Sequence, residues 1–327
     1  MNHNPPKPMN RSLNRTRIAA DRGPWLSERS AKVTSQSGED GILAAILDRI
    51  EEPSKWCVEF GAWDGIHLSN TSNLVANRGY SAVLIEGDPE RFIDLTANVR
   101  GNDKVHTFRR LVGWGDADGL DAILAETPIP KDFGILSIDI DGNDYHVWHA
   151  VRTYRARVVV IEFNPTIPNA VDFVQSADPD VNQGSSVRAL TRLANSKGYE
   201  LVATTATNAF FVDRLQFALL NIEDTSLEIM RTDESWVTHL FVGYDGSIHL
   251  DGCRIAPWHF LPITSHAVQV VPRLLRKFPE SYGRTLRGAL VVYRLWAWLT
   301  SGRIREDIIP RVIERRRRRS TGNPTSG

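Results

Sequence analysis

Short apolar runs alternate with amphipathic segments along most of the chain. The apolar runs cover residues 57–60, 82–85, 105–112, 133–138, 156–165, 199–205 and 209–213. Several of the intervening segments place apolar side chains at helical spacing, which indicates helices that pack on one face. Strands that are apolar on both faces are typical of parallel sheets covered by helices. The pattern therefore predicts an α/β fold with a doubly wound, mostly parallel sheet and right-handed crossovers.

Capping residues mark where the predicted helices begin. The expected N-caps are Ser35 or Ser37 for the helix over 35–50, Asp88 with Pro89 at the first helical position, and Ser185 or Ser186 for the helix that ends at Gly198. In the first helix, apolar side chains recur on one face, which we expect to pack on the sheet. They are Ile42, Ile46, Leu47 and Ile50.

After about residue 215 the alternation of strand and helix stops. Residues 240–250 read as a hairpin with Asp245-Gly246 at its turn, a dipeptide that favours tight turns. Residues 266–319 predict helices, and residues 285–301 among them are apolar and aromatic. Two arginines, Arg287 and Arg294, interrupt that stretch, which is too short and too charged to span a bilayer.

These patterns divide the chain into four expected parts. They are a disordered basic tail over 1–32, an α/β domain over 33–215, a strand-rich extension over 216–265, and a basic helical segment and tail over 266–327. The chain is neutral overall, but residues 1–32 carry a net charge of +5, residues 33–272 carry −15 and residues 273–327 carry +10. An acidic body argues against a nucleic-acid partner. The basic ends fit either solvated tails or contact with an anionic membrane surface.

The cysteines and the N-terminus bear on the compartment. Cys57 and Cys253 lie far apart, with neither a disulfide framework nor a zinc spacing. The N-terminus is rich in Pro, Asn and Arg and lacks the apolar core of a secretory signal. We expect a cytoplasmic protein, associated with a membrane if its basic end binds lipid.

A glycine-bearing turn follows the first strand, within the sequence WCVEFGAWDGIHLSN. It contains Gly61, Asp64 and Gly65, and Glu86 closes the next strand about twenty residues later. A strand, a turn of small residues and an acid at the next strand end make up a nucleotide-type pocket, in which the acid accepts hydrogen bonds from ribose hydroxyls. The glycine spacing is not that of the dinucleotide motif. A purely structural glycine turn is the alternative interpretation.

Four motifs are similar to those of the FkbM-like family of class I S-adenosylmethionine-dependent methyltransferases. They are SQSGEDGIL, VEFGAWDG with the following SNT, VLIEGDPERF and SIDIDGND, within residues 33–215. The resemblance implies a Rossmann-like methyltransferase fold, with the sheet in the order 3-2-1-4-5. It also implies S-adenosylmethionine as cofactor and methyl transfer to a hydroxyl of a sugar or polyketide. The chain departs from the family in having Asp141-Gly142 where a glutamate more often precedes the glycine.

The resemblance also assigns roles on the donor side. Glu59, Gly61, Asp64 and Gly65 would shape the site for the amino-acid end of the methyl donor, Glu86 would hold its ribose, and Asp116 would face its adenine edge.

Oxygen-bearing side chains gather at the ends of two later strands. Asp139 and Asp141 lie two residues apart and so point to the same side, as do Glu162 and Asn164. We expect Asp141, with Asp139, to serve as the catalytic base, and all four residues to be able to hold Mg²⁺ or Ca²⁺. Alternatively, Asp141 and Asn143 stabilise a turn before a helix, and Glu162 pairs with an arginine such as Arg157. His146 and His149 lack a cysteine partner and do not predict zinc.

The sequence thus predicts an S-adenosylmethionine-dependent O-methyltransferase that acts on a small-molecule or glycan hydroxyl. Two other classes stay open: a nicotinamide-dependent oxidoreductase on the same sheet, which the glycine spacing disfavours, and a non-catalytic binding module that docks at a membrane.

Overall fold

The structure, a computed structural model, describes residues 25–300. Most of the predicted tail over 1–32 and the last part of the basic segment, residues 301–327, lie outside the described residues. The chain divides into two compact units, Met1–Val237 and Thr238–Gly327. Each unit is described by itself below.

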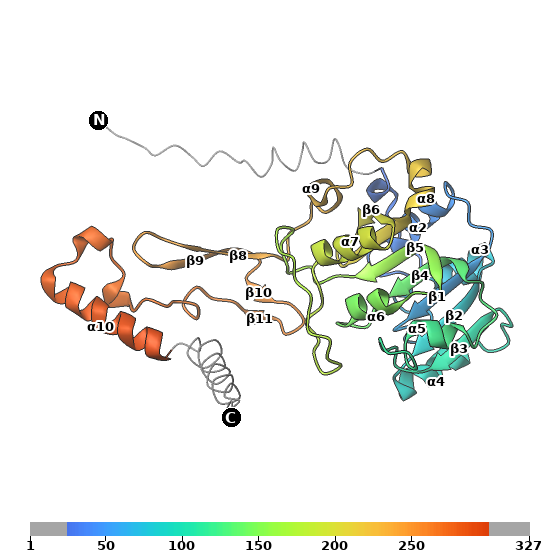
Figure 1. Cartoon of the computed structure of the whole chain (residues 1–327), viewed down its shortest axis with the longest axis horizontal. Coiled ribbons are helices and arrows are strands. Elements are labelled where there is room, and N and C mark those ends of the chain that lie inside the picture. The colour runs from blue at the N-terminus through green and yellow to red at the C-terminus, as the bar shows by residue number, and fades with distance from the viewer. Residues whose placement is uncertain (1–24, 301–327) are drawn as a thin grey trace, which may run out of the picture. The chain divides into compact units, whose positions relative to one another are not determined.

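The first unit is built around a seven-stranded sheet in the order β3-β2-β1-β4-β5-β7-β6 (Figure 1). The strands are β1 (Trp56–Phe60), β2 (Ser81–Glu86), β3 (Val105–Arg109), β4 (Asp132–Ile138), β5 (Arg155–Glu162), β6 (Tyr199–Thr204) and β7 (Asn208–Asp213). The first five are parallel, and β7 runs antiparallel to both of its neighbours. The predicted doubly wound α/β sheet is confirmed, including the order 3-2-1-4-5.

Helices cover the sheet and enclose two apolar cores. They are α2 (Glu39–Leu47), α3 (Ser72–Arg78), α4 (Pro89–Asn98), α5 (Leu120–Leu124), α6 (Asp144–Ala150), α7 (Val187–Ser196), α8 (Arg214–Phe217) and α9 (Leu227–Met230), with the short 3₁₀ helices η1 (Ser27–Arg29) and η2 (Ala218–Leu220). Alternate residues of each central strand enter opposite cores, as Val159 and Val160 of β5 do. This two-sided burial explains the nearly unbroken apolar strands.

Two of the predicted helix starts are confirmed and one is wrong. The side chain of Asp88 accepts hydrogen bonds at the start of α4, and that of Ser186 does so at the start of α7. Neither Ser35 nor Ser37 caps α2, because the helix begins at Glu39 after a left-handed Gly38. The serine-rich segment instead wraps an acidic side chain, that of Asp40, as described below.

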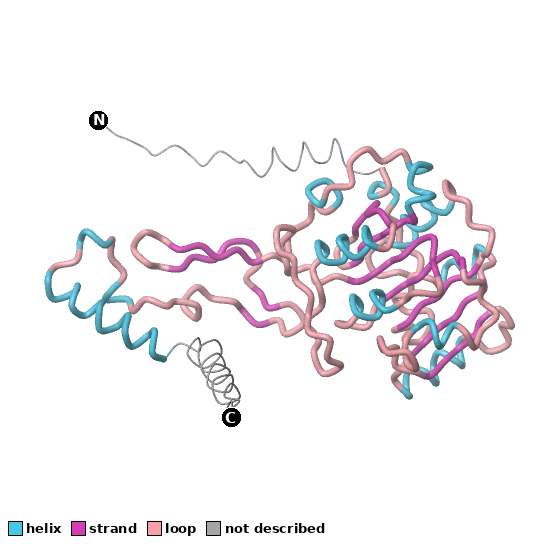
Figure 2. Tube along the Cα trace, viewed as in Figure 1, coloured by secondary structure: helices cyan, strands magenta, loops and turns pink. Residues whose placement is uncertain are grey.

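The second unit begins with the predicted hairpin, which is confirmed as β8 (Thr238–Val242) paired with β9 (Ile248–Gly252). A second pair, β10 (Ile255–Ala256) with β11 (Leu261–Pro262), follows it. Within residues 266–300, the described part of the predicted helical region, the helices are η3 (Arg273–Leu275), η4 (Pro279–Ser281) and α10 (Arg284–Thr300), drawn in cyan in Figure 2. Among residues 25–300, no helix is long and apolar enough to cross a membrane.

Candidate active site

The site lies where the strand order reverses. The chain crosses from β3, at one edge, back to β4, which lies on the other side of β1. In open α/β sheets, ligands bind beyond the carboxyl ends of the strands at such a reversal. Here the chain leaves β1 at Gly61 and leaves β4 at Asp139, and the register of the two strands places these residues side by side.

Gly61 allows the two chain segments to touch. Its φ of +73° lies in the left-handed region, and a Cβ on this residue would stand 1.7 Å from the carbonyl oxygen of Asp139. No other residue type fits there without moving the end of β4. Gly65 also has a left-handed backbone, with φ of +75°, and a Cβ on this residue would stand 2.6 Å from the side chain of Leu95. Both predicted glycines therefore define how the turn packs, and Gly61 remains exposed at the sheet edge.

Glu59 is buried and fully engaged by the loop that follows the turn. Its carboxylate accepts hydrogen bonds from Ser69 Oγ at 2.5 Å, Thr71 Oγ1 at 2.6 Å and the backbone N–H of Asn70 at 2.8 Å. Burial raises its pKa, and these three donors act against that rise. Glu59 thus holds residues 69–71 in place, and this explains the SNT motif that follows the turn.

Glu86 is also buried, at 5% exposure, and it links the turn after β1 to the turn after β2. One carboxylate oxygen accepts the N–H of Trp63 at 2.8 Å and the other accepts the N–H of Asp88 at 2.7 Å. Each oxygen keeps a lone pair free for a further donor. The structure therefore assigns Glu86 a role in positioning the turns, and that role is compatible with hydrogen bonds to ribose hydroxyls.

The other two predicted donor-side residues lie in loops. Asp64 accepts hydrogen bonds from the N–H groups of Ile66 and His67, which closes a local turn. Asp116 is exposed in the loop between β3 and α5.

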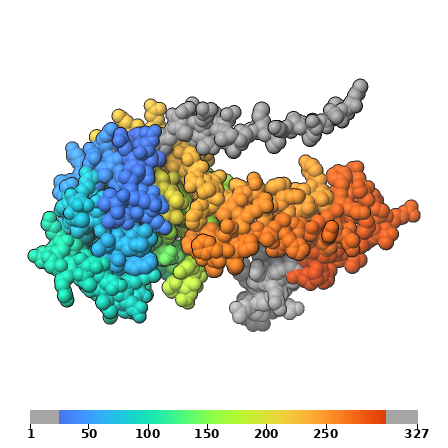
Figure 3. Space-filling model, turned by 180° about the vertical axis from the view of Figure 1, so that it is seen from behind, coloured from blue at the N-terminus to red at the C-terminus, as the bar shows by residue number. Residues whose placement is uncertain are grey.

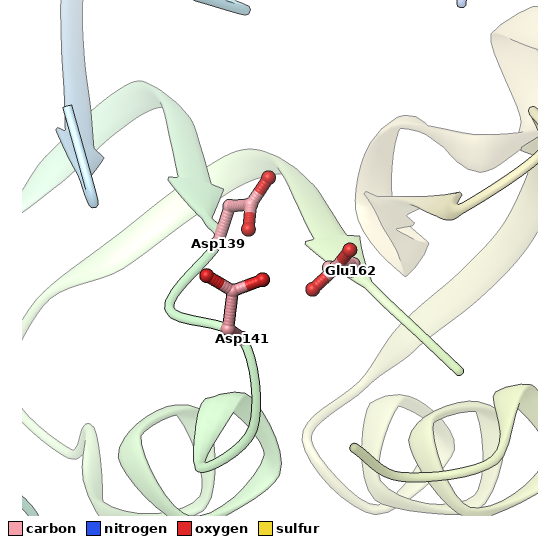
Figure 4. Close-up of side chains that lie close together, drawn as sticks. All are labelled: Asp139, Asp141 and Glu162. Atoms are coloured by element: carbon pink, nitrogen blue, oxygen red, sulfur yellow. The ribbon is translucent and has the colours of Figure 1, made fainter. Parts of the chain in front are cut away.

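Beyond β4 and β5, three carboxylates point toward one another: Asp139, Asp141 and Glu162 (Figure 4). One oxygen from each lies within 4.8 Å of the others. Asp139 and Glu162 are partly buried and Asp141 is exposed. Asp141 adopts a left-handed backbone with φ of +57°, which is uncommon for a residue other than glycine. The grouping predicted from the two-residue spacing is present for these three side chains.

The surroundings favour protonation of this group. Burial raises the pKa of Asp139, and the carboxylates of Asp144 and Asp141 raise it further. Burial raises the pKa of Glu162, and Asp139 adds to that effect. Burial and the neighbouring carboxylates therefore favour the protonated form of this pair.

Asp144, which sequence reasoning missed, shapes the turn that carries Asp141. It is buried, and its carboxylate accepts the N–H groups of Ile140 at 3.0 Å and Gly142 at 2.9 Å. Its place just after the turn in the SIDIDGND motif was the available signal, since an aspartate side chain can accept backbone N–H groups of the residues that precede it.

A loop with neither helix nor strand, residues 163–186, lies against the same turn. Gln175 organises it: its side-chain oxygen accepts the N–H groups of Gln183 and Gly184, and its backbone carbonyl bonds His146 Nε2 at 2.8 Å. A Cβ on Gly142 would meet the Gln175 side-chain oxygen at 3.1 Å. The loop therefore packs closely against the turn that carries Asp141.

Asn164 lies in that loop and its side chain is engaged there. Its amide donates to the carbonyl of Gln183, and its oxygen accepts from the N–H and the hydroxyl of Thr166. The alternative interpretation, in which Glu162 pairs with Arg157, is wrong for that arginine: Arg157 instead donates to the backbone carbonyl of Glu51.

Asn208, which the sequence did not single out, lies beside Glu162. The two residues face each other across the antiparallel β5–β7 pair, so their side chains share one face of the sheet. Asn208 is buried; its amide donates to Glu39 at 3.2 Å, and among the described residues its carbonyl oxygen has no hydrogen-bond partner. An unsatisfied buried oxygen beside three carboxylates adds a further acceptor to this acidic group.

No family model and no curated protein matches this sequence. Solved structures that it resembles include M. capricolum TrmK with S-adenosyl-homocysteine, at 12% identity over 52% of this chain and 65% of that one, with a TM-score of 0.32. A SAM-dependent methyltransferase from Aquifex aeolicus matches at 10% identity over 60% of this chain and 96% of that one, with a TM-score of 0.35. The N-terminal domain of EvdMO1, solved with SAH and D-fucose, matches at 13% identity over 62% and 95%, with a TM-score of 0.37.

The residues present fit both a methyl donor and a hard cation. On the β1–β3 side, the exposed Gly61 turn and the free lone pairs of Glu86 suit the polar parts of a nucleoside. On the β4–β5 side, oxygens within 4.8 Å of one another match the span of ligands around one ion, since Mg²⁺ and Ca²⁺ hold oxygen at roughly 2.0–2.6 Å.

Proposed function

We propose that this protein is an S-adenosylmethionine-dependent O-methyltransferase whose acceptor is a hydroxyl of a sugar or glycan. The carrying observation is the placement of two polar constellations on either side of the β1–β4 reversal. The Gly61 turn with Glu86 lies on one side, and Asp139, Asp141 and Glu162 lie on the other. Methyl transfer needs a donor and an acceptor brought together, and two adjoining sites of this kind suit that requirement.

S-adenosylmethionine, when bound, supplies an electrophilic methyl group on a positively charged sulfur. The protein's own residues then have two tasks, which are alignment and removal of the acceptor's proton. Asp141 takes the proton from the attacking hydroxyl, because it is the exposed member of the acidic group. Asp139 and Glu162 bind neighbouring hydroxyls, and vicinal hydroxyls of a sugar match such closely spaced carboxyl groups.

The first experiment tests the donor. Isothermal titration of the purified protein with S-adenosylmethionine, S-adenosylhomocysteine and NAD should show binding of both sulfur ligands and none of NAD. Glu86→Gln should weaken S-adenosylhomocysteine binding roughly tenfold, since a hydrogen bond to a charged group contributes about 1.5–3 kcal/mol. Glu90→Gln, an exposed change in the first turn of α4, is the matched control. Tight NAD binding alone would favour the oxidoreductase, and no binding would favour a non-catalytic module.

The second experiment tests the acid group, with turnover measured as S-adenosylhomocysteine release on a panel of sugars. Asp141→Asn should lower kcat at least a hundredfold, the usual effect of losing a general base, and leave donor affinity unchanged. Asp180→Asn, an exposed change in the 163–186 loop, should have no effect. Full turnover by Asp141→Asn would exclude Asp141 as the base.

The same assay decides whether a cation takes part. Chelator should abolish turnover, and Mg²⁺ or Mn²⁺ should restore it, if the three carboxylates hold an ion that acidifies the acceptor hydroxyl. If the carboxylates act without an ion, chelator should change nothing.

A further inference from the structure

The helix α10 of the second unit carries apolar side chains on two opposite sides, one partly buried and the other exposed. Leu286, Leu290, Tyr293 and Ala297 follow the four- and three-residue steps of a helix stripe, and all four are partly buried. Tyr293 also donates its hydroxyl proton to the carbonyl of Val270 at 2.6 Å. This stripe is the side by which α10 is attached to its own unit.

The attachment continues to the hairpin of the same unit. Gln269, next to Val270, donates to the carbonyl of Ile248 in β9 and accepts its N–H. The helix is therefore held in a defined orientation within the second unit, with its opposite side turned outward.

That outward side is broad and apolar. Six side chains line it, each between 54% and 67% exposed: Val291, Val292, Leu295, Trp296, Trp298 and Leu299. At 3.6 residues per turn, five of these positions fall opposite the partly buried stripe, and Trp296 lies at the flank, with its ring centroid 5.6 Å from that of Tyr293. The space-filling view shows the red atoms near residue 300 at the molecular surface (Figure 3). We name these six residues the outer face of α10.

Positive charge borders the outer face. Arg287 and Arg294 lie seven residues apart and so share one edge of the helix, next to Trp298, while Arg284 lies within the face at its first turn. Residues 284–300 contain no acidic side chain, and residues 273–327 carry a net charge of +10. Tryptophan and arginine together suit a membrane surface, since the indole lies at the headgroup level and the guanidinium extends to the phosphates.

We propose that the outer face of α10 docks the protein on an anionic lipid bilayer, with the helix lying in the plane of the headgroups. The helix is about 25 Å long at 1.5 Å per residue, and amphipathic helices of this kind bind by apolar burial together with attraction to anionic lipid. The charge complementarity of an acid-free, arginine-bordered face with anionic lipid selects this occupant.

Vesicle sedimentation of the full chain tests the proposal, with phosphatidylcholine vesicles that contain or lack phosphatidylglycerol. The wild type should bind the anionic vesicles more tightly, and added salt should weaken that binding. Leu295→Glu with Trp298→Glu should abolish it, whereas Leu215→Glu, at an 86% exposed site of the first unit, should not. Arg287→Gln and Arg294→Gln should each weaken binding roughly fivefold.

Two results would overturn the proposal. One is equal vesicle binding by the wild type and the Leu295→Glu, Trp298→Glu variant. The other is no vesicle binding by the wild type together with a wild-type dimer that the same variant converts to a monomer in light scattering, because the outer face would then be covered by a second copy of the chain.

Discussion

Glu59 and Glu86 lie at the ends of β1 and β2, and Asp139 and Glu162 lie at the ends of β4 and β5. The first pair accepts hydrogen bonds from donors in neighbouring loops, such as Ser69 and the N–H of Trp63. The second pair faces other carboxylates. An acid at a strand end that is surrounded by hydrogen-bond donors positions the chain. One that is surrounded by other acids is protonated or able to bind a ligand. Position in the fold alone does not distinguish the two roles; the neighbouring donors do.

The largest loss of stability is expected at the contact between the turn after β1 and the turn after β4. Gly61→Ala should destabilise the protein by about 3–5 kcal/mol, because its Cβ would overlap the carbonyl of Asp139. Gly79→Ala is the matched control: it has nearly the same φ, +74°, and no atom within 4 Å of its Cβ. That variant should lose only about 1–2 kcal/mol, the cost of a left-handed alanine. Urea unfolding measures the stability of both variants. Equal losses would mean that the close approach of Gly61 to the Asp139 carbonyl does not stabilise the fold.

The next effect separates the two kinds of acid. Glu59→Gln should cost about 2–3 kcal/mol of unfolding free energy, because its amide would face a former donor inside the protein. Glu162→Gln should cost nothing at neutral pH, because glutamine resembles the protonated acid that its neighbours favour. An equally large loss in Glu162→Gln would show that Glu162 is structural as well.

A smaller effect concerns pH. In the folded state the pKa of Asp139 is raised to about 8 and that of Glu162 to about 10, so between about pH 5 and pH 10 these groups bind more protons in the folded chain than in the unfolded one. Stability from these groups is present at low pH and is lost as pH rises through that range. In chelator, the unfolding free energy of wild type should therefore fall with pH more steeply than that of Glu162→Gln. If the unfolding free energies of wild type and Glu162→Gln changed with pH in parallel, the raised pKa of Glu162 would be wrong.

Much of the fold could be predicted from the sequence because strand burial leaves a direct record. Five strands apolar on both faces predicted the parallel sheet, an inference that rests on strand period, which is local. The two-residue spacings of Asp139 with Asp141 and of Glu162 with Asn164 predicted the grouping only together with the strand order that the family resemblance implied.

The partners of the buried acids could not be predicted in the same way. Asp40 accepts three backbone N–H groups, from residues 33–35, as well as the hydroxyl of Ser35, whose oxygen accepts the N–H of Asp40 in return. Ser35 therefore bonds to the first turn of α2, while Gly38 occupies the N-cap position. Whether Glu59 meets hydroxyls or other acids depends on where residues 69–71 return to the sheet. Such returns are set by packing across the whole domain and leave no short-range pattern.

Glu39, at the start of α2, has a consequence for synthesis of the chain. Its side chain is completely buried, and its carboxylate accepts hydrogen bonds from Thr205 Oγ1 at 2.7 Å and from Asn208, residues that leave the ribosome 166 and 169 positions later. Until β7 emerges, burying Glu39 would cost the hydration of a carboxylate without these two donors. Helix α2 can therefore dock fully only once β7, the last strand of the sheet, has been translated. Folding of this unit is completed when its C-terminal strand joins the helix near its N-terminus.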